Sequence, residues 1–329
     1  MAYRFKLKEG LRDGVRRIAV EQIEKVLKAP HRGEDRAAWV HEARKAMKRT
    51  RALLKCVRSG LDDRTFREEN AALAEIARSL SNLRDRDVMA QTIAGLVGND
   101  KRLDEALDCL DKHLHAPIDG KQFRPPSSRS ADAVARDAIK ALEKARARLA
   151  KIEVAGELTD SVGTGLRATQ RKGREALERL RLEATDENVH DLRKVVQVHQ
   201  RQQLLVYAVW PEMQHVRIEA ARTLAQLLGE AQDLAVLASV ARTLAESEAP
   251  DATCWGRLVD DACRERQERI REAAIPMAAR LFAARPSAIE RDLTAVWEAA
   301  LALDATDHPV EVKPATGVPR KRTARVTLP

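Results

Sequence analysis

Residues 40–55 read VHEARKAMKRTRALLK, and this stretch decides the interpretation of the whole chain. When the stretch is placed on an α-helix at about 100° per residue, its apolar side chains lie on one face, and Val57, two residues after its end, lies on the same face. They are Val40, Ala43, Ala46, Met47, Leu53, Leu54 and Val57. The opposite arc, about 120° wide, carries His41, Arg44, Lys45, Lys48, Arg51 and Lys55, with Arg49 at its edge. The stretch therefore predicts an amphipathic helix that docks its apolar face in a helical bundle.

The cationic face of this helix lacks the acids that usually accompany such a face. From Ala43 to Arg58 there are seven lysines and arginines and no aspartate or glutamate. On a solvated helix, a glutamate one turn from a lysine stabilises the helix by roughly a few tenths of a kcal/mol, and like charges destabilise it similarly. We call this cationic face the basic stripe and interpret it as a surface for a bound polyanion. The alternative is that acidic side chains on neighbouring helices neutralise it.

The composition of the full chain excludes several classes of protein. The 329 residues are 44% hydrophobic, enough for two buried cores, but only 3% aromatic, which argues against single-stranded nucleic-acid binding by stacking. No apolar run approaches the roughly 18 residues of a membrane span. The four cysteines form no CxxC pair, so neither a disulfide framework nor a cysteine-rich zinc site is expected, and a cytoplasmic location is favoured.

Apolar residues recur at helical spacing throughout, so the fold class is predicted to be all-α. Helices are expected near 9–28, 36–58, 64–82, 85–96, 101–115, 131–152, 161–183, 187–208, 213–228, 231–247, 254–283 and 287–303. The predicted division is a first helical bundle at 1–118, a Pro- and Ser-rich linker at 119–130, a second helical bundle at 131–304 and a basic disordered tail at 305–329. Residues 313–329 carry five of the nine net positive charges, so the body of the chain is close to balanced.

Two motifs recur in the same order. VHEARK at 40–45 returns as VHDLRK at 189–194, and LSNLRDRDV at 80–88 is matched by LLGEAQDLAV at 227–236. His41 precedes Asp85 by 44 residues, and His190 precedes Asp233 by 43. This internal repeat predicts two pseudo-symmetric bundles of the four-helix type. The patterned acids Asp85, Asp87 and Asp233 are expected to orient a basic side chain or to cap a helix.

Further basic side chains extend the candidate surface. The segment 165–174 contains four cations and no acid: Arg167, Arg171, Lys172 and Arg174. The N-terminal helix adds a thinner row with Arg12 and Arg16 one turn apart. There is no Gly-rich phosphate loop, GxSxG or HExxH motif, so we expect a non-catalytic protein with no catalytic residue, cofactor or metal ion. His41 is positioned to donate a hydrogen bond to a phosphate oxygen or to make a polar contact in the core.

With these residues assembled, the chain resembles the CHAD family, the conserved-histidine α-helical domain. The resemblance covers roughly residues 5–304 and rests on VHEARKAMKRTRALLK (40–55), LSNLRDRDVM (80–89), GLRATQRKGREAL (165–177), VHDLRKVV (189–196) and LLGEAQDLAVL (227–237). It implies two bundles that enclose a basic surface, binding of inorganic polyphosphate, and association with cytoplasmic polyphosphate granules and their proteins.

The resemblance also implies which residues contact the ligand. In the first half they are His41, Arg44, Lys45, Lys48, Arg51 and Lys55. In the second half they are Arg167, Arg171, Lys172, Arg174, His190, Arg193, Lys194 and Arg201. Gln197 stands where the first copy has Lys48, so the second half is expected to contribute less to binding.

Two other functions remain open at this point. Nucleic acid could bind through the basic surface and tail, but only non-specifically, because no motif that reads bases is present. A phosphohistidine-type phosphotransfer module would need one exposed histidine beside a cation, as at His41, whereas this basic stripe is far larger.

Overall fold

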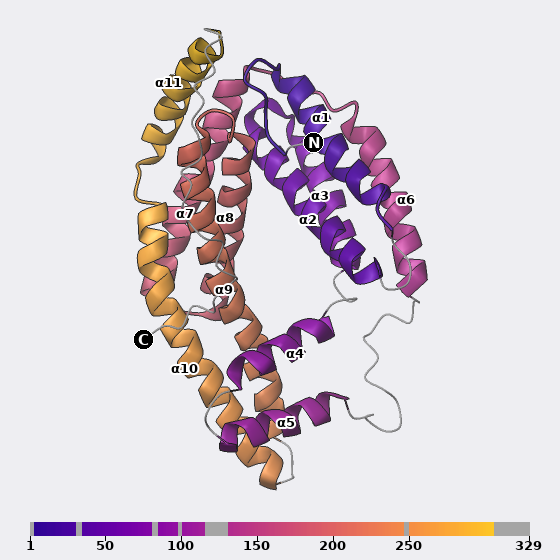
Figure 1. The fold of residues 1–329 in the computed structure, drawn as a ribbon, viewed down its shortest axis with the longest axis vertical. Helices are drawn as coiled ribbons and strands as arrows, with labels where there is room; N and C mark the ends of the chain where they lie inside the picture. The colour runs from indigo at the N-terminus through magenta and orange to yellow at the C-terminus, as the bar shows by residue number, and fades with distance from the viewer. Residues whose placement is uncertain are drawn as a thin grey trace, which may run out of the picture.

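The computed structural model describes residues 3–30, 35–80, 85–97, 101–115, 131–246 and 250–305. All regular secondary structure in these ranges is helical, which confirms the predicted all-α class (Figure 1). The predicted linker at 119–130 and the tail beyond Ala305 lie outside the described residues. No helix in the described ranges combines the length and the apolar character needed to cross a bilayer.

The structure contains eleven α-helices and one 3-10 helix in the described ranges. They are α1 (Leu11–Leu27), α2 (Asp35–Cys56), the 3-10 helix η1 (Arg58–Gly60), α3 (Asp63–Ser79), α4 (Asp85–Leu96), α5 (Lys101–His115), α6 (Ala131–Leu149), α7 (Leu158–Leu182), α8 (Asp186–Leu205), α9 (Pro211–Ala245), α10 (Pro250–Leu281) and α11 (Pro286–Ala305).

The first hydrophobic core is built mainly by α1, α2, α3 and α6, with further side chains from α7, α8 and α11. Ile18 of α1, Trp39 and Leu53 of α2, Leu73 of α3 and Leu142 of α6 are all buried in it. Although α6 follows the segment 116–130, it packs against α1 and α3 at the edge of this bundle (Figure 1). The amphipathic faces of these four helices thus form the main part of one core.

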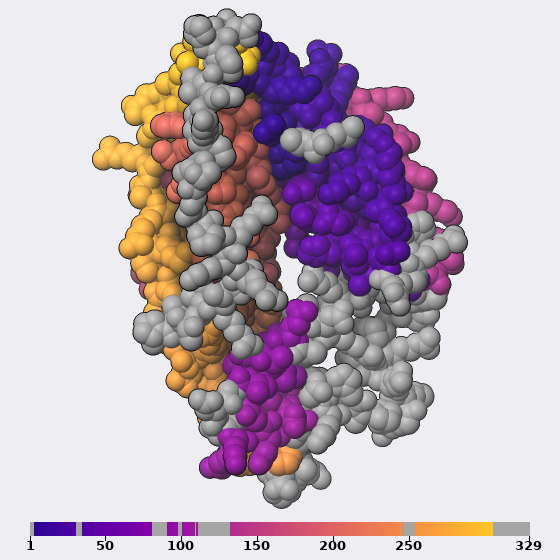
Figure 2. Space-filling view, in the orientation of Figure 1, coloured from indigo at the N-terminus to yellow at the C-terminus, as the bar shows by residue number. Residues whose placement is uncertain are grey.

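The second core is built by α7, α8, α9 and α10, and it recruits α4 and α5 from earlier in the chain. Ile93 of α4 and Leu107 of α5 are buried among the side chains of α9 and α10. Figure 2 shows the purple side chains of this region, at the bottom of the view, beside orange side chains from the C-terminal half of the chain. The predicted boundary at 119–130 therefore does not separate the two cores, because α4 and α5 find their apolar partners on the long helices α9 and α10.

Helices α7 and α8 each bury apolar side chains in both cores. On each helix, buried polar residues lie between the part in the first core and the part in the second. On α7, Val162 belongs to the first core and Leu177 to the second, and on α8, Leu205 belongs to the first and Val196 to the second. Between them lies a buried polar layer composed of Thr169, Gln170, His199, Gln202 and Gln203. These two helices therefore join the bundles and set where the end of α2 lies.

One helix boundary predicted from the sequence is wrong. The two helices expected at 213–228 and 231–247 form the single helix α9, and Gly229 lies inside it. A Cβ atom at 229 would lie 2.9 Å from the Nη2 atom of Arg193 in α8. Gly229 thus makes room for a neighbouring side chain and does not end the helix.

The internal repeat stays a prediction. Its two motif-bearing helices, α2 and α8, contact each other at the junction of the bundles.

Candidate anion-binding surface

Helix α2 buries the face that the sequence predicts to be apolar. All seven predicted apolar residues, from Val40 to Val57, are at most 5% exposed. On the opposite face His41, Lys48 and Lys55 are exposed, and they recur every seven residues. Fourteen residues at 1.5 Å rise make this row about 21 Å long. The partly buried flanking cations are Arg44, Lys45, Arg49 and Arg51.

At the end of α2, cations from three helices come together. The pKa of Lys55 is lowered from 10.5 to about 8, first by loss of water around its amine and then by repulsion from four neighbouring cations. With Lys55, these neighbours form the interhelical cation cluster: Arg51 of α2, Lys172 of α7, and Lys194 and Arg201 of α8. The two halves of the sequence therefore contribute to one surface.

The acids that would neutralise this cluster are scarce. Within the described ranges, Lys55, Lys172 and Arg201 form no ion pair, and Lys194 pairs with Asp191 on its own helix at 2.9 Å. Arg51 donates from Nε to the amide oxygen of Asn70 at 3.0 Å, a neutral partner. Cations held together without matching anions raise the free energy of the empty site, and a bound anion relieves this repulsion.

The other end of the stripe is partly neutralised, but by an acid of α2 itself and not by one on a neighbouring helix. Glu42 accepts hydrogen bonds from Lys45 at 3.1 Å and from Lys25 of α1 at 3.4 Å. Burial opposes the ionisation of Glu42, but these two lysines outweigh it and lower the pKa of the carboxyl group. The acid-free segment begins at Ala43, and the residue directly before it, Glu42, already neutralises Lys45.

The basic cluster of α7 is divided between two surfaces. Arg167 forms an ion pair with Glu290 of α11 at 2.8 Å, and Arg174 donates to the carbonyl oxygens of Phe282 and Ala283. Arg171 pairs with Glu175 on its own helix at 3.6 Å. Of the four predicted cations, Lys172 is the one that joins the interhelical cation cluster.

The motif residues of α8 also point to different surroundings: Lys194 joins the interhelical cation cluster, whereas Arg193 does not. Arg193 turns toward α9, where its Nη1 atom donates to the amide oxygen of Gln232 at 2.6 Å. Burial lowers the pKa of Arg193, and the nearby Asp233 opposes this shift, as expected for an acid that orients a basic side chain. His190 is partly buried, and its Nδ1 atom finds no hydrogen-bond partner among the described residues. Arg193 therefore acts mainly in packing α8 against α9.

The N-terminal cations Arg12 and Arg16 also have matched charges. Both pair with Glu153, at 3.6 Å and 2.6 Å, and Arg16 donates in addition to the carbonyl oxygen of Ile152. These contacts fasten α1 to the connection between α6 and α7. The side chains of Asp85 and Asp87 lie outside the part of the chain whose side chains are described.

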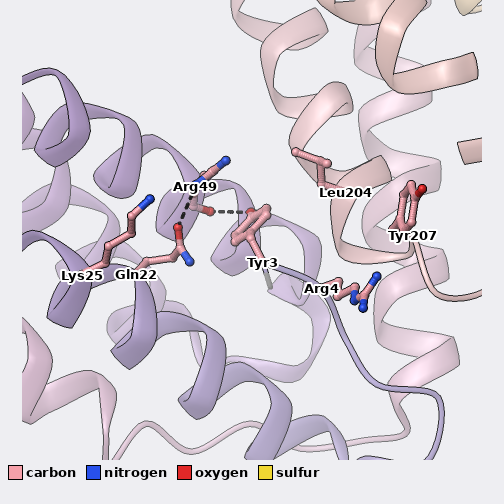
Figure 3. A pocket seen from close by; sticks show the side chains of 7 residues that line it. All are labelled: Tyr3, Arg4, Gln22, Lys25, Arg49, Leu204 and Tyr207. Atoms are coloured by element: carbon pink, nitrogen blue, oxygen red, sulfur yellow. Dashed lines mark hydrogen bonds between the residues drawn. The ribbon is translucent and has the colours of Figure 1, made fainter. Parts of the chain in front are cut away.

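A cleft beside the cluster was not predicted from the sequence. It is lined by Tyr3, Arg4, Gln22, Lys25, Arg49, Leu204 and Tyr207 and has a volume of about 400 Å³ (Figure 3). We call it the tyrosine cleft. The signal in the sequence was that Tyr3 and Tyr207 are the two tyrosines of an aromatic-poor chain. In the described ranges no group of three or more His, Cys, Asp or Glu side chains could hold a metal ion.

A family model of the CHAD domain matches residues 17–242. The chain belongs to the CHAD domain family. The matched region of this CHAD protein runs from α1 to near the end of α9 and includes both motif histidines and the whole interhelical cation cluster. It is shorter than the expected 5–304 and leaves out α10 and α11. A search of curated proteins found no match.

Proposed function

We propose that this CHAD protein binds inorganic polyphosphate without catalysis, through the interhelical cation cluster and the exposed row on α2. The observation that carries the proposal is the state of Lys55. Its amine is partly dehydrated, surrounded by four cations, and without an acidic partner among the described residues. A ligand with dense negative charge removes the repulsion that lowers the pKa of this lysine.

The chemistry of the ligand matches the chemistry of the surface. A linear polyphosphate has charge at every unit and neither bases nor apolar edges, so it needs rows of lysine and arginine and little else. Seven-residue spacing along α2 supplies such a row, and α7 and α8 continue it across the junction. Membership of the CHAD family supports the same ligand, and with it a location at cytoplasmic polyphosphate granules and contact with granule proteins.

The first experiment is calorimetric titration of long-chain polyphosphate into the full chain and into two charge-matched variants. Lys55→Glu with Lys172→Glu removes two cations of the cluster. Lys140→Glu with Lys144→Glu makes the same charge change on exposed positions of α6, on the far side of the first bundle (Figure 1). Each lost charged contact costs about 1.5–3 kcal/mol, so the cluster variant should lose at least about 100-fold in affinity.

The control variant should stay within a few-fold of the natural chain, with unchanged helical circular dichroism in both. Equal affinities of the two variants would remove the cluster from the site. RNA added as a competitor at one fixed salt concentration separates polyphosphate binding from general affinity for nucleic-acid backbones. Displacement of polyphosphate by equimolar RNA would favour the nucleic-acid alternative.

A further inference from the structure

The tyrosine cleft brings together both tyrosines of the chain from positions far apart in the sequence. Tyr3 belongs to the segment before α1, and Tyr207 follows α8. The N–H of Phe5 donates to the carbonyl oxygen of Leu205 at 2.8 Å, which holds the N-terminal segment against the end of α8. The cleft therefore lies where the first bundle meets the helix that carries Arg201.

One wall of the cleft is fixed by hydrogen bonds. Tyr3 is buried, and its hydroxyl donates to the carbonyl oxygen of Arg49 at 2.7 Å. The Arg49 guanidinium lies 5.4 Å from the centre of the Tyr3 ring and donates to the amide oxygen of Gln22 at 3.3 Å. Figure 3 shows Arg49, Gln22 and Lys25 on this side. These contacts hold the Arg49 guanidinium in a fixed position at the cleft.

The facing wall offers a ring surface. Tyr207 is partly buried and Arg4 is exposed, with the Arg4 guanidinium carbon 5.8 Å from the ring centre. Leu204 adds apolar area beside them (Figure 3). A planar aromatic group can stack on the phenol of Tyr207 or on the guanidinium of Arg4, as bases do on such side chains.

The charge of the cleft favours an anion. Its lining contains three cations and no acidic side chain, although Lys25 pairs with Glu42 just outside the lining. Arg201 of the interhelical cation cluster interacts electrostatically with both Tyr3 and Arg49. The cleft is therefore a neighbour of the cluster, and a ligand in it can extend a phosphate chain toward Arg201.

We propose that the tyrosine cleft binds a nucleoside triphosphate, with the base on Tyr207 and Arg4 and the phosphates directed to Arg49 and Arg201. This inference goes beyond polyphosphate binding, because it assigns a ligand whose affinity comes in part from an aromatic ring. The volume of about 400 Å³ lies within the range of small-ligand sites.

The test compares ATP with tripolyphosphate, which has the same phosphate chain and no ring, by calorimetry on the full chain. ATP should bind at least about fivefold more tightly, since stacking of one base supplies that much. Tyr207→Leu should abolish this preference while keeping apolar bulk, and Tyr207→Phe, which keeps the ring, should retain it. Arg4→Gln should weaken ATP more than tripolyphosphate.

Equal affinity of the natural chain for ATP and tripolyphosphate would overturn the proposal, and so would a preference that survives Tyr207→Leu. Long-chain polyphosphate is titrated into the natural chain, Tyr207→Leu and Tyr207→Phe. If the preference for ATP holds while long-chain polyphosphate does not bind, the nucleotide site stands and the proposed function fails. If long-chain polyphosphate binds equally to these three proteins and ATP shows no preference, the proposed function stands and the nucleotide site fails.

Discussion

Gly165 of α7 lies directly against the backbone of Cys56 at the end of α2. A Cβ atom at position 165 would overlap the carbonyl oxygen of Cys56. This close approach brings α7 beside Lys55, and Lys172, seven residues after Gly165, reaches the interhelical cation cluster from the same side. A glycine that looks unfavourable in a helix thus sets the distance between two cationic helices.

Gly165→Ala is expected to destabilise the protein by about 1–3 kcal/mol or more, because the added methyl group meets rigid backbone. Helix propensity alone predicts the opposite sign, a gain of about 1 kcal/mol. Gly95→Ala is the matched control, since an added Cβ in this exposed part of α4 meets nothing within 4 Å. Urea unfolding of both variants measures the difference, and equal stabilisation by both would show that α7 has room to move.

The pair Arg193 and Gly229 allows a test by double-mutant cycle. In the natural chain, Gly229→Ala should lower the free energy of unfolding, because the new Cβ would lie 2.9 Å from the Arg193 guanidinium, which is held by Gln232. In an Arg193→Ala background the same change should stabilise α9 by about 0.5–1 kcal/mol. A Gly229→Ala effect that is the same in both backgrounds would show that the guanidinium does not restrict this position.

Polyphosphate affinity should decrease with rising pH near the pKa of Lys55. With a pKa of about 8 in the free protein, Lys55 is mostly charged at pH 7 and mostly neutral at pH 9. A bound anion raises this pKa, so affinity should fall about tenfold across that interval. Lys55→Arg keeps its charge and should flatten the profile. An unchanged slope in this variant would assign the pH dependence to another group.

The same shift predicts how stability responds to pH. The folded protein holds the Lys55 proton less tightly than the unfolded chain, so the contribution of Lys55 to the free energy of unfolding should increase as pH rises from about 8 toward 10.5. Lys55→Met removes this contribution. The difference between the two proteins in urea unfolding at pH 7 and pH 10 measures it.

Acid should destabilise the protein through His199 in the buried polar layer. Burial, aided by Arg217, lowers the pKa of His199 from 6.5 to about 4, and the ring packs edge-on against Phe282 at 5.5 Å. Between these pH values the unfolded chain binds a proton that the folded protein does not. Stability should therefore fall by about 3 kcal/mol from above pH 6.5 down to pH 4.

His199→Gln places a neutral polar group in the same layer and should remove this dependence. Urea unfolding at pH 7 and pH 4.5 for both proteins measures it. A variant that loses as much stability in acid as the natural chain would assign the effect to carboxyl groups elsewhere.

The sequence by itself determined the helices, the amphipathic character of α2 and the family. Helical hydrogen bonds and the 3.6-residue period join positions three and four apart, so residues 40–55 contain the evidence for their own fold. The same locality explains the prediction of two helices in place of α9. A glycine in the sequence does not reveal that Arg193, on another helix, occupies the space beside Gly229.

The tertiary structure alone decided which cations act together. Arg167 and Lys172 are five residues apart on α7, yet one pairs with Glu290 and the other joins Lys55. The partner of each is more than a hundred residues distant, and its identity depends on how helices pack. The tyrosine cleft and the exchange of α4, α5 and α6 between the cores have the same origin. Each arises from apolar faces that find partners far along the chain, and no local pattern encodes which face meets which.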